Sequence, residues 1–193
     1  EIDYSLAACA VELGSDDAEG ALRDFERRHP GSVYANDVRF SLGSYYCAVG
    51  NMPLAREAFE RTEYKALSAP RREQYDIRMG YVEFTQGDYA AAYDRFSRIG
   101  SRSEYADHAL YYRSYIDYAE GRYDRAKDGF TQLTRSDAYR DLVPFYLLQI
   151  EFRNGNYRYV VDHGEELVRK AVPERQAELE RVIAESWFRL DNY

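Results

Sequence analysis

Hydrophobic residues along the chain recur every three to four positions, in a succession of separate stretches. That period places them on one face of an α-helix, whereas no stretch alternates with the period of two that marks a strand. Glycine, proline and small polar residues separate the stretches and end the helices. The pattern therefore predicts an all-α chain with helices over residues 3–13, 17–28, 36–49, 54–62, 72–86, 89–99, 104–120, 123–133, 139–154, 157–170 and 174–190.

A Gly-x-Tyr fragment connects several pairs of these helices. Its glycines are Gly87, Gly121 and Gly155, two steps of 34 residues (87 to 121 and 121 to 155), and Gly50 lies 37 residues before Gly87. Glycine is the usual residue just past a helix end, so each fragment predicts a tight turn within a helical hairpin. A fixed period of this size is typical of stacked repeats. The expected single array comprises repeats over 1–33, 34–70, 71–102, 103–137 and 138–173 and a partial repeat over 174–193.

Other residues recur in register with these turns. The pair Leu42-Gly43 precedes the first turn in the sequence, and Ala55 and Phe59 follow that turn. The arrangement resembles the tetratricopeptide repeat (TPR) family, in which Leu-Gly, an aromatic residue, Gly and Ala-x-x-x-Phe follow one another. The next two repeats match at Met79-Gly80, Gly87, Ala92 and Phe96, and at Ser114, Gly121, Ala126 and Phe130. The fourth departs from the pattern, with Val160 and Gly164 in place of the Ala and Phe.

The TPR resemblance implies an α-solenoid of stacked antiparallel helix pairs in a right-handed superhelix. Small residues at Gly43, Gly80 and Ser114 are expected to let the partner helix approach closely through its alanine. The phenylalanine that follows is expected to fill the space between one hairpin and the next. Arrays of this kind present long surfaces to other molecules.

By the same resemblance, one stripe of each first helix lines a concave groove. Spacing of i, i+4 and i+7 defines such a stripe, and the tyrosines on or beside it are the expected partner-binding residues: Tyr81, Tyr111, Tyr112, Tyr115 and Tyr146. The last stripe positions, Phe84, Tyr118 and Phe152, are instead expected to be core. The Lys, Asn and Arg clamp with which co-chaperone TPR domains bind a peptide carboxylate is not visible at these positions.

Composition narrows the classes of partner. The net charge is −8, which argues against nucleic acid, since that binding relies on Lys and Arg. No apolar run approaches the roughly 18 to 20 residues that span a bilayer, so membrane insertion is not expected. Tyrosine occurs 20 times and tryptophan once. The cysteines, Cys9 and Cys47, lack a C-x-x-C spacing and are expected to be buried free thiols.

The sequence contains no residues arranged for catalysis. P-loop, dinucleotide, H-E-x-x-H and G-x-S-x-G motifs are absent, so no cofactor, metal or enzymatic activity is expected. Glu83, Asp117 and Glu151 each stand four residues before a repeat glycine. Such a row can be imagined as a metal or acid–base site, but the favoured interpretation is that each carboxylate accepts hydrogen bonds from a tyrosine hydroxyl or a backbone N–H.

Three functions fit a repeat array without chemistry of its own. The first is an interaction scaffold that holds a protein or peptide in the groove. The alternatives are a structural module that assembles with itself or with other parts of its parent chain, and a glycan-binding accessory domain of a cell-envelope system, because stacked tyrosines suit sugars as well as peptides. Long bacterial envelope proteins often carry TPR arrays, so the resemblance indicates export to the envelope or periplasm.

Both ends of the chain are expected to be cut from a longer protein, because residue 1 is Glu1 and Tyr193 occupies the Gly-x-Tyr position of a further repeat. The final predicted helix would then lack the helix that covers it. Val182, Ile183, Trp187 and Leu190 are expected to leave apolar surface open there, since solenoids require polar caps. The sequence therefore predicts self-association through this end.

Overall fold

The computed structural model describes residues 2–12, 15 and 17–191, and those residues form eleven α-helices and one 3₁₀ helix with no strand. Helices account for 76% of the structure, which confirms the prediction of an all-α chain. The chain divides into two compact units, residues 1–105 and 106–193.

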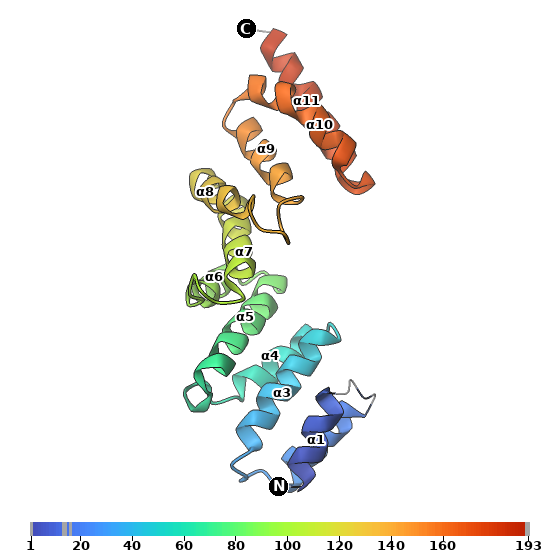
Figure 1. Ribbon diagram of the computed structural model, residues 1–193, viewed down its shortest axis with the longest axis vertical. Coiled ribbons are helices and arrows are strands. Elements are labelled where there is room, and N and C mark those ends of the chain that lie inside the picture. The colour runs from blue at the N-terminus through green and yellow to red at the C-terminus, as the bar shows by residue number, and fades with distance from the viewer. Residues whose placement is uncertain (1, 13–14, 16, 192–193) are drawn as a thin grey trace. The chain divides into compact units, whose positions relative to one another are not determined.

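In the first unit, each α-helix lies against the next one along the chain (Figure 1). Its core gathers apolar side chains from successive helices, with Leu22, Val38 and Phe59 almost fully buried. The elements of this unit are α1 (Ile2–Glu12), α2 (Ala18–Arg28), α3 (Ala35–Ala48), α4 (Met52–Glu60), the 3₁₀ helix η1 (Tyr64–Ala66), α5 (Ala69–Thr85) and α6 (Tyr89–Ser97).

The second unit follows the same scheme of neighbouring helices (Figure 1). Two apolar clusters form its core, one around Phe130 between α7, α8 and α9 and one around Leu179 between α9, α10 and α11. Its elements are α7 (Ala106–Ala119), α8 (Tyr123–Leu133), α9 (Val143–Arg153), α10 (Tyr157–Lys170) and α11 (Pro173–Asp191).

The repeat glycines adopt one backbone conformation. Gly50, Gly87, Gly121 and Gly155 have φ of 77° to 80°, in the left-handed region that favours glycine. In each turn the glycine N–H donates to the carbonyl three residues earlier, and the next N–H donates to the carbonyl five residues earlier at 2.8 or 2.9 Å. These two bonds define a Schellman motif, which satisfies carbonyl groups at the end of a helix. The same helix-ending turn therefore recurs along the chain and accounts for the repeat period.

The tyrosine of each Gly-x-Tyr fragment begins the following helix and packs across the turn. Its partner is the aromatic residue three positions before the glycine: Tyr89 with Phe84 at 5.5 Å between ring centroids, Tyr123 with Tyr118 at 5.9 Å, and Tyr157 with Phe152 at 5.8 Å. All six side chains are half-buried. Phe84, Tyr118 and Phe152 therefore help to hold the hairpins together, as the core interpretation of these positions expects.

Gly121→Ala is expected to lower the free energy of unfolding by about 1 kcal/mol, because an L side chain disfavours a positive φ. No other atom lies within 4 Å of the position a Cβ would take at Gly121, so backbone strain is the expected cause. Urea denaturation would measure it. Gly31→Ala is the matched control, since that glycine has open space and no positive φ; equal losses in the two variants would contradict the prediction.

The small residues of the first helices leave room for aromatic rings. A Cβ at Gly43 would lie 2.6 Å from the ring of Phe59, and one at Gly80 would lie 2.8 Å from the ring of Phe96. The nearest atoms are thus those of the phenylalanines, not of the alanines expected from the sequence. In the fourth repeat Gly164 takes the place of the phenylalanine, and there it admits Ile183 from the next helix, 2.6 Å from a built Cβ.

Several details differ from the sequence prediction, among them the start of α5, which begins at Ala69 rather than at residue 72. Residues 139–142 form a turn, and α9 begins at Val143 because Pro144 fits only the first turn of a helix. The 3₁₀ helix η1 was not expected. Helix α11 packs along α10 and buries Val182 and Ile183, so these two residues do not leave the apolar surface predicted for them. Leu13, the expected end of the first helix, lies outside the described residues.

Candidate binding site

Six tyrosines gather in the second unit and form what we call the tyrosine cluster: Tyr111, Tyr112, Tyr115, Tyr118, Tyr139 and Tyr146. Four of them lie on α7 at helical spacing, one precedes α9 and one lies on α9. The cluster thus brings together four of the five partner-binding residues predicted from the sequence.

Tyr146 forms the floor of the cluster. It is buried, and its ring stacks on Phe130 with 4.9 Å between centroids and an interplanar angle of 8°. Tyr115 and Tyr118 make T-shaped contacts with the same ring, at 5.8 and 5.6 Å between centroids. Tyr146 therefore packs beneath other members of the cluster, which are half-buried.

The half-buried tyrosines form the outer part of the cluster. Tyr111 stacks on Tyr139 at 4.7 Å and shares a hydrogen bond of 3.3 Å between its hydroxyl and that of Tyr146. Tyr112 packs against Tyr111 at 5.3 Å and against His108 at 5.0 Å. The outer members thus form a continuous aromatic surface that is itself supported by a ring stack.

Four phenol groups of the cluster, those of Tyr111, Tyr118, Tyr139 and Tyr146, stay protonated near neutral pH because their pKa values are raised. Burial raises the pKa of Tyr111, Tyr118 and Tyr146 above the usual value, and it raises the pKa of Tyr139 to about 12. A protonated phenol offers one donor and an acceptor beside a large apolar ring. Such groups can orient a polar segment while the rings bury its apolar parts.

Tyr81, the fifth predicted residue, is half-buried on α5 in the first unit. The corresponding stripe on α3 is covered by arginines of α5. Arg71 and Arg78 lie 5.5 and 5.8 Å from the ring centroid of Phe40, and Arg78 donates to the hydroxyl of Ser44 at 2.6 Å. At this stripe of the first unit, two arginines therefore lie over an aromatic ring. The corresponding stripe on α7 in the second unit consists of tyrosines.

A pocket of about 360 Å³ lies near the cluster in the second unit. The start of α9, the end of α10 and the start of α11 enclose it. Phe145 connects the two features, because it lines the pocket and also packs against Tyr146 at 5.3 Å between centroids. The guanidinium of Arg175 lies 5.1 Å from the centroid of the Phe145 ring.

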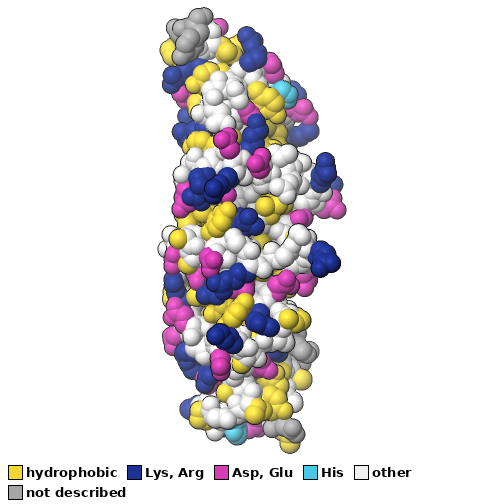
Figure 2. All heavy atoms as spheres, turned by 90° about the vertical axis from the view of Figure 1, so that its left-hand side faces the viewer, with side chains coloured by type: hydrophobic (Ala, Val, Ile, Leu, Met, Phe, Trp, Pro, Cys, Tyr) yellow, Lys and Arg dark blue, Asp and Glu magenta, His cyan; other side chains and the backbone are white. Residues whose placement is uncertain are grey.

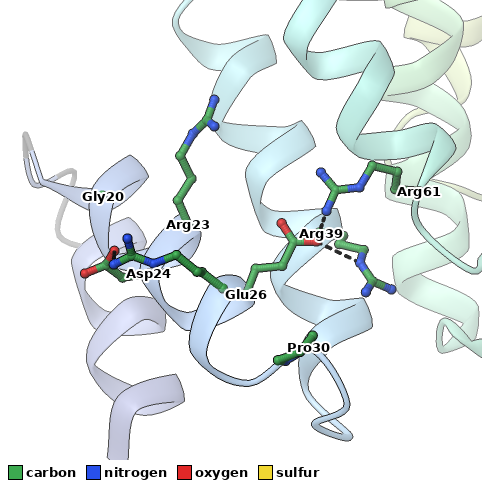
Figure 3. Close-up of a pocket in the computed structure, with 8 residues that line it drawn as sticks. Gly20, Arg23, Asp24, Glu26, Pro30, Arg39 and Arg61 are labelled. Carbon is green, nitrogen blue, oxygen red and sulfur yellow. Dashed lines mark hydrogen bonds and ion pairs between the residues drawn. The ribbon is translucent and has the colours of Figure 1, made fainter.

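A wider pocket of about 670 Å³ lies in the first unit and is lined by four arginines (Figure 3). Figure 3 shows Glu26 between Arg39 and Arg61, which both donate to the same carboxylate oxygen, Arg39 at 2.9 Å. Arg27 pairs with Asp24 at 2.7 Å, and Arg23 donates to Tyr46 and Glu19 at 2.9 and 2.8 Å. Glu26 thus links α2 to α3 and to the end of α4, Arg23 links α2 to α3 through Tyr46, and Arg27 pairs within α2.

The three carboxylates before the repeat glycines each bind a basic side chain. Asp117 pairs with Arg122 at 2.6 Å, Glu151 with Lys127 at 2.6 Å and Glu83 with Arg95 at 3.4 Å. Each carboxylate thus pairs with a cation, and Glu151 also accepts from the Asn156 amide, whereas the sequence interpretation expected tyrosine hydroxyls or backbone N–H groups.

Their surroundings affect the two glutamates differently. Burial raises the pKa of Glu83 despite Arg95. Burial would also raise the pKa of Glu151, but hydrogen bonds from Lys127 and Asn156 outweigh it and lower that pKa. Within the described part of the chain, no three His, Cys, Asp or Glu residues lie close enough together to hold a metal ion.

The two thiols also differ from expectation. Cys9 is exposed rather than buried, while Cys47 is half-buried and burial raises its pKa to about 11. Neither forms a disulfide, and both lie in the first unit, outside the tyrosine cluster.

On the face drawn in Figure 2, Lys and Arg side chains are interspersed with Asp and Glu. None of the described helices combines the length and hydropathy needed to cross a lipid bilayer. No known protein family model and no characterised protein match this sequence. The likeness to TPR repeats therefore rests on the residues of this chain.

Two groups of the second unit were missed by the sequence interpretation. Tyr139 joins the cluster from a turn, so it shares no helical stripe with the other tyrosines. Arg175 comes from α11 and reaches the pocket beside Phe145. Pro144 could have indicated the position of Tyr139. Proline fits only the first turn of a helix, so Tyr139 must precede the helix that contains Pro144.

Proposed function

We propose that this chain is a non-enzymatic interaction scaffold, a TPR-like α-solenoid with a right-handed superhelix that binds a protein or peptide. Support for the architecture comes from four identical Schellman turns at nearly constant spacing. Further support comes from Phe59, which packs between Phe40 of its own hairpin and Tyr75 of the next, at 6.1 and 5.2 Å.

The tyrosine cluster is the observation that carries the binding function. Aromatic side chains supply large contact area at a small cost in rotamer entropy, and their hydroxyls adapt to polar groups. In the cluster, a buried floor supports half-buried rings, which is how a preorganised binding surface is built. Tyr111, Tyr112 and Tyr115 contact the partner in this proposal, and Tyr146 positions them. Tyr81 lies in the first unit and is proposed as a contact residue of that unit alone.

Selection from a displayed library of random peptides tests the function. We expect the immobilised protein to enrich peptides that a variant carrying both Tyr112→Ala and Tyr115→Ala does not capture. The matched control carries Tyr93→Ala and Tyr159→Ala, two tyrosines on second helices outside the cluster. Enrichment of the same peptides on the cluster variant would contradict the proposal.

A glycan-binding role remains the alternative that the same cluster supports, because tyrosine rings also stack on sugars. An array of immobilised glycans separates the two functions. Binding to glycans that is lost with Tyr112→Ala, combined with no enriched peptide, would favour the alternative.

Self-assembly is supported by the end of α11. Trp187 and Phe188 are 46% and 66% exposed on its last turns, while Leu190 is half-buried. Exposed large apolar side chains at neighbouring positions favour contact with another apolar surface. In this proposal two copies of the chain meet through these residues.

Trp187→Glu is expected to abolish this association, because it places a charge within the apolar contact. Sedimentation equilibrium over a range of concentrations would measure the change. Tyr159→Glu is the matched control, since Tyr159 is 45% exposed on α10 and belongs to neither surface. A wild-type chain that stays monomeric at high concentration would show that no such contact forms.

A further inference from the structure

The pocket between α9, α10 and α11 combines an apolar interior with a charged rim. Phe145, Leu167, Val172 and Leu179 line it, and Leu179 is almost fully buried. Its volume of about 360 Å³ lies within the range of roughly 300–1,000 Å³ found for ligand pockets. The interior therefore suits one large apolar side chain.

The rim of this pocket is positive although the whole chain carries a charge of −8. Arg140, Lys170 and Arg175 lie on it, against one acid, Asp141. Arg140 pairs with Asp137 at 2.9 Å and Lys170 with Glu166 at 2.6 Å. Arg175 forms no ion pair with any residue that the structure describes.

Phe145 holds Arg175 at the pocket. A guanidinium that lies over an aromatic ring can still direct N–H groups toward a carboxylate and donate two parallel bonds to it. Phe145 also packs against Tyr146 in the tyrosine cluster. A carboxylate bound by Arg175 would therefore lie beside the surface to which the proposed function assigns the partner.

We propose that this pocket binds an internal acidic residue of the partner polypeptide together with a large apolar residue next to it. Arg175 takes the side-chain carboxylate, and the apolar side chain enters between Leu167 and Leu179. A polypeptide is favoured over a free carboxylic acid because the adjoining tyrosine cluster can bind the rest of the segment. This proposal rests on the proposed function and adds the chemistry of the partner.

The test uses a peptide without terminal charges, acetyl-Ser-Glu-Phe-Ser-amide, titrated into the whole chain and followed by backbone amide resonances. We expect saturable shifts at residues lining the pocket. Arg175→Gln should raise the dissociation constant at least fivefold, while Arg169→Gln, which removes the same charge outside the lining, should leave it within twofold. The peptide with Gln in place of Glu should bind at least fivefold more weakly to the wild type. The spectra also report whether each variant is folded.

Three results would overturn the proposal: no saturable shift at the pocket, equal binding of the Glu and Gln peptides, or equal losses for Arg175→Gln and Arg169→Gln. A fourth would be binding of 3-phenylpropionate as tightly as the peptide, which would assign the pocket to a free acid. None of these contradicts the scaffold itself, because the library selection with the tyrosine variants tests that separately. A selection that yields no peptide would contradict both the proposed scaffold function and this proposal for the pocket.

Discussion

Gly80→Leu is expected to lower the free energy of unfolding by about 1–3 kcal/mol, the usual cost of overpacking a core. A Cβ at this position would lie 2.8 Å from the ring of Phe96 and 3.1 Å from the Cβ of Arg95. Phe96 is fully buried, so its ring cannot move aside without displacing other core groups. Urea denaturation followed by far-ultraviolet circular dichroism would measure the loss.

Gly100→Leu is the matched control for this change. Gly100 follows α6, no atom lies within 4 Å of a Cβ built there, and its φ is not positive. The control is expected to change the free energy of unfolding by less than about 0.5 kcal/mol, as surface substitutions usually do. Equal losses at the two glycines would show that the repeat pattern does not mark the close contacts between helices.

Tyr112→Ala and Tyr115→Ala are each expected to weaken binding of a selected peptide by about 1–2 kcal/mol, roughly 5–30-fold. Both side chains are half-buried on α7 beside the buried floor formed by Tyr146. Removing either ring deletes contact area from a preorganised aromatic surface. Isothermal titration calorimetry with the wild type and each variant would measure the change, and affinities within twofold of the wild type would exclude that residue from the interface.

Helices and their turns could be predicted from the sequence because both depend on local chemistry. The period of apolar residues locates the helices, and glycine at Gly87, Gly121 and Gly155 marks the positive φ that ends one helix of each hairpin. The start of α9 differs from the predicted one. Pro144, which fits only the first turn of a helix, sets the start of α9, and the hydrophobic period around it concealed that boundary.

Contacts between helices were predicted less well, because spacing identifies a face but not the atom that meets it. Gly43 and Gly80 were correctly identified as close-contact positions, yet the atoms they face belong to Phe59 and Phe96. Likewise, the position of Glu151 indicates a buried carboxylate, while Lys127, which lies 24 residues earlier (151 − 127), neutralises it. Such pairs depend on how whole helices pack together, so no single position of the sequence reveals them.

The candidate site was partly predictable for the same reason. Helical spacing brings Tyr111, Tyr112 and Tyr115 together on α7, and the structure unites them with Tyr146. The burial of Tyr146 results from its stack on Phe130, which belongs to a different helix. Arg175 comes from a third helix, so nothing near it in the sequence connects it with the tyrosines.

The most direct test of the account compares binding and stability in the same variants. For Tyr115→Ala and for Phe130→Ala, affinity for a selected peptide and the free energy of unfolding would be measured together. Phe130 is fully buried, and its loss should cost about 3–5 kcal/mol of stability. The account predicts that Tyr115→Ala loses affinity by 5–30-fold while losing much less stability than Phe130→Ala. If Tyr115→Ala instead unfolds as readily as Phe130→Ala and its folded fraction binds like the wild type, the tyrosine cluster is core and not a binding surface.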